Sequence, residues 1–313
     1  MRALTASLSA VRAVLQVTLA QLMRDPAVLI VLLAGFVLIV GAPAYAVFQF
    51  GEVRKVMVDT GLSSALLAGM LLALIGPARA MAYELEDRTA LSLLSKPLNR
   101  WALVSGKYLG VTAAAAAAVI PLTLVTLYVV RIEEALDDDP AAAPVAAVLI
   151  AASAAALLAL LGGLLLPRRR ALAAWAAITG TAAAGLLLIG PPGAWRWEIL
   201  AAGALVLLEV AVVAAAATAS AARFGAVGTL AGGLAFLLAG HARSLLGPER
   251  LGDPVAAVLG LLPGLEVLNG IDAVAAGARI SVAYVALAAI CALLYVFALL
   301  FVGAALLQSR EVA

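Results

Sequence analysis

The stretch AVLIVLLAGFVLIVGAPAYAVF, residues 27–48, contains no charged side chain. A block of about 20 apolar residues is long enough to cross the hydrocarbon core of a bilayer, which is roughly 30 Å thick. Two breaks, Arg168-Arg169-Arg170 and Pro191-Pro192-Gly193, divide the apolar middle of the chain, so two spans there could fall short of a full crossing. We therefore predict an all-α transmembrane bundle of six to eight spans, eight being favoured. The predicted spans are 27–48, 61–80, 103–130, 144–166, 171–190, 199–221, 225–241 and 281–307.

The composition agrees with a membrane protein. Hydrophobic residues make up 65% of the chain, charged residues 12%, and the mean hydropathy is +1.14. Soluble domains have about 25% charged residues. The 313 residues leave room for spans and short connections, so we expect one transmembrane domain over 1–313. The single cysteine, Cys291, and the single histidine, His241, exclude an intrachain disulfide and an ordinary zinc site, and we predict no metal.

The N-terminal stretch 5–24 has the pattern of an amphipathic helix. Apolar residues recur at helical spacing, with polar residues elsewhere on the wheel, which is typical of a helix lying on a membrane surface. The apolar positions are Leu8, Val11, Leu15, Leu19 and Leu22. Asp25-Pro26 then fits a helix N-cap followed by proline at the first helical position.

The basic residues predict the orientation. With the N-terminus inside, 13 of the 20 lysines and arginines fall in cytoplasmic segments and 7 outside. This bias favours a multi-pass protein with both termini cytoplasmic, which we expect in a bacterial plasma (inner) membrane. Acidic residues between Glu133 and Asp139 gather in one predicted outside loop, which is consistent with the same orientation. The segment 243–279 is long for a linker, and its leucine spacing predicts an extracytoplasmic or re-entrant helix.

The segment MAYELEDRTALSLLSKPLNRWALVSGKYLG, from Met81 to Gly110, holds the clearest functional signal. It mixes acids, bases and leucines over a stretch longer than a simple connection needs. The pattern predicts an amphipathic helix, a break at Lys96-Pro97, and a second helix that runs into the next span. A charged helix–turn–helix beneath a membrane is suited to docking a soluble partner. The alternative is that these charges are solvated and anchor the helix ends, and residue chemistry alone leaves both readings open.

The ordered motif Glu84-x-Glu86-x-x-Thr89, Leu93-Leu94-Ser95-Lys96-Pro97, Arg100 and Gly106-Lys107-Tyr108-Leu109-Gly110 resembles the type-2 ABC transporter permeases. The resemblance is closest to the subgroup named for maturation of a multicopper enzyme. It implies a permease that pairs with a separate cytoplasmic ABC ATPase and with a second copy of itself in a homodimer. It also implies that residues 81–107 form the coupling helix. The residues it places at or beside the ATPase contact are Glu84, Glu86, Arg88, Thr89, Lys96, Pro97, Arg100 and Lys107.

The chain itself carries no predicted nucleotide site. Gly106-Lys107 fails the phosphate-loop pattern, because Trp101 stands where the first glycine is required and Tyr108 where Ser or Thr is required. We therefore expect no cofactor in this chain and no enzymatic activity of its own, with ATP and Mg²⁺ held by the partner ATPase. We also expect contact with membrane lipids and no nucleic acid.

Glu209 is the one acidic residue in the middle of a predicted span. An ionisable group at that depth costs at least about 2.5 kcal/mol and usually faces the bundle interior or a wet cavity. It is a possible pathway residue or a neutral structural group; the structural role is slightly favoured because the sequence identifies no partner for it.

Three functions remain open. The leading one is the permease subunit of an ABC exporter. The second is an ATP-driven mechanotransmission or scaffold subunit that moves no substrate, which would use the same coupling segment. The third is an intramembrane lipid-modifying enzyme, which is disfavoured because the chain has no Ser/His/Asp group.

Overall fold

The computed structural model describes residues 2–46, 52–86, 100–138, 179–180, 196–250, 260 and 262–311. Within these residues the regular structure is helical, without strands. The helices are α1 (Arg2–Leu22), α2 (Pro26–Ala46), α3 (Val53–Glu86), α5 (Arg100–Asp138), α8 (Trp197–Ala221), α9 (Ala226–Arg250), η3 (Leu265–Leu268), α11 (Ile271–Ala275) and α12 (Val282–Glu311). The all-α prediction is confirmed for the described part of the chain.

Five of the described helices are long and apolar enough to cross a membrane. They are Pro26–Ala46, Val53–Ala80, Arg100–Glu134, Trp197–Ala221 and Val282–Leu307. Each matches a span predicted from hydropathy. The predicted span 225–241 corresponds to a shorter apolar helix, Ala226–Ala242, within α9. The predicted spans 144–166 and 171–190 lie outside the described residues, apart from positions 179–180, which are helical.

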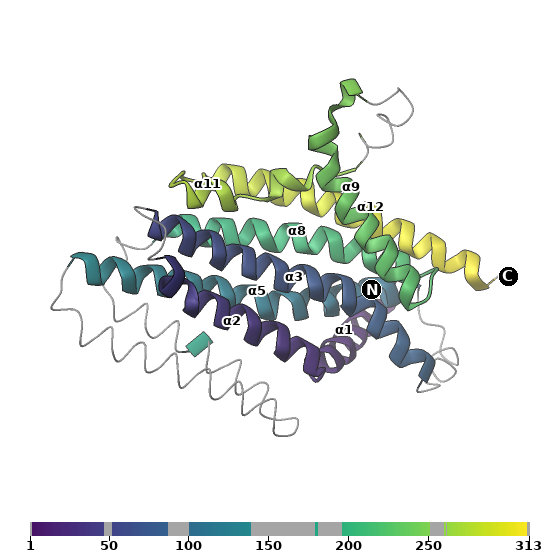
Figure 1. Ribbon diagram of the computed structural model, residues 1–313. Helices are drawn as coiled ribbons and strands as arrows, with labels where there is room; N and C mark the ends of the chain where they lie inside the picture. Colours follow the sequence, from purple (N-terminus) through teal and green to yellow (C-terminus); the bar gives the residue numbers. More distant parts are fainter. Residues whose placement is uncertain are drawn as a thin grey trace.

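The long helices run roughly side by side, so the bundle has two ends (Figure 1). At one, which we call the loop end, α3 finishes and α5 begins. The end of α8, the start of α9 and the end of α12 lie there too, and α1 lies across it. At the other, the far end, α3 begins, α5 finishes and α8 begins. The end of α3 and the start of α5, which flank the predicted coupling segment, therefore lie at the same end of the bundle as α1.

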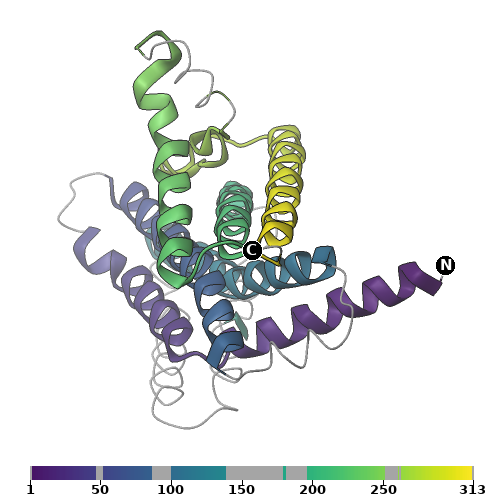
Figure 2. The same ribbon diagram turned by 90° about the vertical axis from the view of Figure 1, so that its right-hand side faces the viewer.

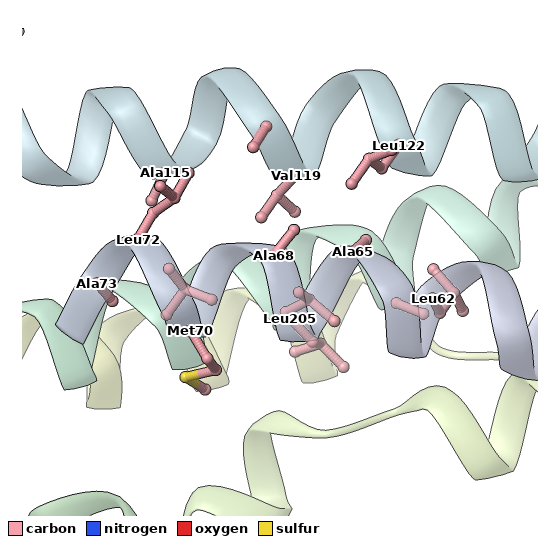
Figure 3. Packing of buried hydrophobic residues seen from close by; sticks show 14 of the residues in the cluster. Leu62, Ala65, Ala68, Met70, Leu72, Ala73, Ala115, Val119, Leu122 and Leu205 are labelled. Carbon is pink, nitrogen blue, oxygen red and sulfur yellow. The ribbon is translucent and has the colours of Figure 1, made fainter. Parts of the chain in front are cut away.

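The core of the bundle is the packing of α3 against α5. Ala65 and Ala68 of α3 face Val119 and Leu122 of α5, and all four are at most 2% exposed (Figure 3). Hydrophobic burial does not drive helix association in lipid, so close van der Waals contact between small residues has to supply the stability. Gly69 shows how tight the fit is, because a Cβ there would lie 2.7 Å from Cγ2 of Val119. The contact between α3 and α5 is therefore closely packed around these residues.

Helix α8 lies in the interior of the bundle. It packs against α3, α5, α9 and α12, and in the end-on view it lies between α9 and α12 (Figure 2). Most of its side chains from Ile199 to Ala221 are buried. By contrast, only 22% of the apolar window of α12 is buried, so α12 presents most of its apolar surface outward.

The helices extend beyond the apolar runs that predicted them. Helix α3 starts at Val53 instead of 61, and α5 continues to Asp138 instead of ending near 130. Glu133, Asp137 and Asp138, which we expected in a loop, are part of α5. Hydropathy marks the part of a helix that lipid can cover, whereas the backbone remains helical through the polar turns at either end.

The segment expected to form a helix within 243–279 is divided instead. Helix α9 continues to Arg250, and Leu265 and Leu268 lie in η3. Asn269 separates η3 from α11, and its side-chain oxygen accepts a hydrogen bond of 3.1 Å from the Ile271 backbone N–H. Leu265, Leu268 and Ile271 are at most 5% exposed. The leucine spacing therefore reflects burial against the bundle, without one continuous helix.

Candidate functional site

The site begins with the two helices that flank the predicted coupling segment. Glu84 and Glu86 lie in the last turns of α3, and Arg100 is the first residue of α5 and is exposed. Arg88, Thr89, Lys96 and Pro97 lie outside the described residues. Lys107 lies two turns into α5 and is only 9% exposed. The structure thus places both ends of the segment at the loop end of the bundle.

A buried carboxylate joins the α1–α2 turn to α3. Asp25, whose side chain is 2% exposed, forms an ion pair with Arg79 near the end of α3. Its other oxygen accepts a hydrogen bond of 2.9 Å from the Ala27 backbone N–H. This geometry confirms Asp25 as the N-cap of α2, with Pro26 at the first helical position. One side chain therefore starts α2 and holds α3 shortly before the coupling segment.

Two glycines of α5 form a seat for α1. A Cβ at Gly106 would lie 2.6 Å from the Val14 Cβ, and one at Gly110 would lie 2.7 Å from the Thr18 Cβ and 3.1 Å from the Leu15 carbonyl oxygen. Glycines four residues apart let two helix backbones approach closely. The two glycines of the motif that resembles the permeases thus contact α1, the helix that lies across this end of the bundle.

An aromatic contact ties the first turn of α5 to α12. The ring of Trp101 stacks on Phe297 at 5.8 Å between centroids, and Phe301 lies at 5.9 Å in a tilted arrangement. Such aromatic pairs contribute about 0.5–1.5 kcal/mol beyond the area they bury. With Asp25–Arg79 and the glycine seat, this contact completes what we call the loop base, which is built by Asp25, Arg79, Trp101, Gly106, Gly110, Phe297 and Phe301.

The loop base permits a direct test of its ion pair between Asp25 and Arg79. Replacing Asp25 with alanine removes both the N-cap of α2 and the partner of Arg79. We expect a loss of about 2 kcal/mol, because a cap contributes about 1 kcal/mol and a half-exposed ion pair no more than that. Thermal unfolding in detergent measures the loss. Asp59→Ala is the control, because Asp59 is exposed and, within the described part of the chain, accepts a hydrogen bond of 3.3 Å from Ser63 of its own helix. Equal melting temperatures for the two variants would contradict the bracing role of Asp25.

A second polar cluster lies at the far end of the bundle. Glu134 of α5 binds three guanidinium groups: Arg131 Nη1 at 2.9 Å, Arg196 Nη2 at 2.7 Å and Arg54 Nε at 3.7 Å. These arginines lie on α5, immediately before α8, and in the first turn of α3. Glu134 is 16% exposed and Arg131 is 12% exposed, so their contact is largely shielded from solvent. We call Glu134 and its three arginines the far-end cluster; it links the far-end portions of three helices.

Glu209, the predicted pathway residue, lies midway along α8 and is fully buried. Among the described residues, the ionisable side chain next to it is His241 of α9, with Nε2 lying 3.3 Å from Oε1. The sequence alone indicates no partner for Glu209, whereas the structure places His241 beside it. The 32-residue separation between them gave no local signal, since it depends on how α8 and α9 turn back on each other.

Sequence reasoning also left the loop base incomplete. It singled out Asp25, Gly106 and Gly110 but did not connect them with Arg79, α1 or Trp101. The spacing of the two glycines was a usable signal for a close helix contact. The partner helix was not predictable, because hydropathy gives neither the rotation of a helix nor the point at which it crosses another.

Neither a protein-family model nor a curated protein matches this chain. The description of the site therefore rests on its own geometry: the closely packed helices α3 and α5 flank the predicted coupling segment, and α1, the α1–α2 turn and α12 contact them near that end.

Proposed function

We propose that this chain is the permease subunit of an ABC exporter. The observation that carries the proposal is the way the predicted coupling segment is held. It joins α3 and α5, which contain 34 and 39 residues and therefore extend for about 51 and 58 Å at 1.5 Å per residue. Both lengths exceed the roughly 30 Å of a bilayer core. A push on the segment would travel along two closely packed helices, each long enough to reach through the membrane.

The contacts of the loop base would transmit that movement to the neighbouring helices. Asp25–Arg79 passes movement of α3 to the α1–α2 turn, the glycine seat passes movement of α5 to α1, and Trp101 passes it to α12. In this proposal α1 lies at the cytoplasmic membrane surface, both termini are cytoplasmic, and the membrane is a bacterial plasma membrane. A separate ATPase binds residues 81–107, and two copies of the permease work as a homodimer. Glu84, Glu86, Arg88, Thr89, Lys96, Pro97 and Arg100 form the ATPase contact, and the buried Lys107 supports it from within.

Charge reversal tests the contact. In Glu84→Lys and Arg100→Glu we expect at least a tenfold drop in Mg²⁺-ATP hydrolysis that co-purifies with the tagged permease from native membranes in mild detergent. The reason is that a like charge replaces one half of each complementary pair at the interface. Membrane insertion and the yield of the permease itself should not change.

Matched controls exist at the far end of the bundle. Glu52→Lys and Lys55→Glu reverse the same kinds of charge in an exposed pair, in which Lys55 Nζ lies 3.0 Å from Glu52 Oε2. We expect these variants to retain the co-purifying ATPase. If all four variants retain it, or if wild type carries no ATPase, the proposed coupling role is wrong. ATP hydrolysis without any substrate stimulation in liposomes would favour the mechanotransmission alternative.

A further inference from the structure

Among the described residues, the carboxylate of Glu209 is buried beside the ring of His241 without a hydrogen-bond donor. Glu209 is 0% exposed, and neither of its carboxylate oxygens has a hydrogen-bond partner among the described residues. Leu205, Val206, Val212 and Val213, which surround it along α8, are fully buried as well. A bare carboxylate in such surroundings would lose its hydration with no compensating donor, which is costly.

The other ring nitrogen of His241 determines what Nε2 can offer. Nδ1 lies 3.1 Å from the Leu237 carbonyl oxygen. A carbonyl oxygen can only accept, so the hydrogen of this contact belongs to Nδ1. In the neutral ring Nε2 is then a lone-pair acceptor. It faces Glu209 Oε1 at 3.3 Å, and two acceptors at that distance repel each other unless a proton lies between them.

We propose that Glu209 and His241 form a proton-binding site within the bundle, in which one proton is shared between Nε2 and Oε1 and holds α9 against α8. The proton can be written as imidazolium with carboxylate or as neutral imidazole with carboxylic acid. Both forms contain the same number of protons and satisfy both atoms. A proton can bind at this position because it needs no cavity, and the side chain of Glu209 is fully buried.

The surroundings connect this proton to the position of α9. Helix α9 approaches its neighbours closely in the turns that lead to His241: a Cβ at Gly233 would lie 3.1 Å from the Ala217 Cβ, and one at Gly240 would lie 2.7 Å from Leu265 Cγ. The side chain of His241 is 36% exposed, so the ring, and not the carboxylate, is the accessible member of the pair. Among the described residues, Glu266 of η3 is the other charged group whose field reaches the ring. If the shared proton were lost, the lone pair of His241 Nε2 would face the carboxylate of Glu209. The two groups would then repel each other within this closely packed region.

The single histidine of the chain makes the test direct. Full-length protein labelled with ¹⁵N-histidine and reconstituted in nanodiscs gives one pair of ring signals. At pH 8 in the wild type, we expect Nδ1 to be protonated and Nε2 to show the shift of a nitrogen that shares or carries a proton. A neutral ring whose Nε2 is a free acceptor, or one whose Nδ1 lacks hydrogen, would overturn the proposal without any variant having to fold.

Two isosteric variants assign the signal. In Glu209→Gln the amide N–H replaces the shared proton, so the Nε2 signal should move to that of a neutral acceptor while Nδ1 stays protonated. Glu266→Gln is the control, because it removes the other nearby carboxylate charge and should leave the shared-proton signal of Nε2 in place. An unchanged Nε2 signal in Glu209→Gln, or loss of the signal only in Glu266→Gln, counts against the site. ATPase binding enters none of these readouts, so their outcome is independent of the proposed transporter function.

Discussion

Glu134→Gln should destabilise the protein by about 2 kcal/mol, because it removes the charge that three arginines share. Breaking a buried ion pair costs about 3–5 kcal/mol, whereas an exposed pair contributes about 0–1 kcal/mol. The far-end cluster lies between these limits, since Arg131 is 12% exposed but Arg54 and Arg196 are 43% and 39% exposed. Thermal unfolding in detergent gives the loss as a lower melting temperature.

Glu52→Gln provides the comparison for this prediction. Glu52 pairs with Lys55 at the same end of the bundle, and their side chains are 59% and 52% exposed. Removing its charge should change stability by no more than about 0.5 kcal/mol. If the two glutamine variants unfold at the same temperature, the far-end cluster does not hold α3, α5 and α8 together. Arg131→Lys tests the contact between Arg131 and Glu134 separately, because lysine keeps the positive charge but cannot reproduce the planar guanidinium contact.

Gly110→Leu should release α1 from α5. The new side chain would start 2.7 Å from the Thr18 Cβ and 3.1 Å from a backbone oxygen, and the backbone oxygen cannot move aside as a flexible side chain could. Overpacking of this kind costs about 1–3 kcal/mol, and we expect the upper end of that range. Release of α1 can be followed with a cysteine at position 18, because Thr18 is 4% exposed and thiol–maleimide coupling requires access.

The labelling experiment uses a Cys291→Ser background, since Cys291 is the only native cysteine and is exposed. Thr18→Cys alone should react slowly, and adding Gly110→Leu should raise the rate by at least tenfold. Gly41→Leu is the matched control, because a Cβ at Gly41 meets nothing within 4 Å. Equal protection of the thiol in both leucine variants would show that the glycine seat is not needed to hold α1.

The sequence predicted the helices well because the bilayer imposes a simple requirement on them. Each of the five spans in the described residues contains an apolar run near 20 residues, which hydropathy detects directly. The helix ends were predicted less well. Arg54 and Lys55 lie in the first turn of α3, outside the expected span, because a helix that leaves the lipid can continue through charged residues.

The contacts between helices could not be predicted in the same way. Glu134 and Arg196 lie 62 positions apart, and no periodic pattern connects them. The pattern of the α1 stretch predicts a helix lying on a membrane surface. Leu8, one of the residues behind that interpretation, is 62% exposed, whereas Thr18 is 4% exposed and packs on α5. Which face of a helix turns inward depends on small residues of its neighbours, here Gly106 and Gly110, which hydropathy does not weigh.

The glycine seat also has a consequence for synthesis. Helix α1 leaves the ribosome before α5, and the residues that receive it are translated roughly 90 positions after it. At about 5–20 residues per second, α1 waits roughly 5 to 20 seconds before its partner surface exists. During that interval α2 and α3 are synthesised, and the apolar face of α1 does not yet have α5 to pack against. A nascent chain halted before residue 106 should therefore leave α1 open to protease, and one released after α5 is complete should protect it.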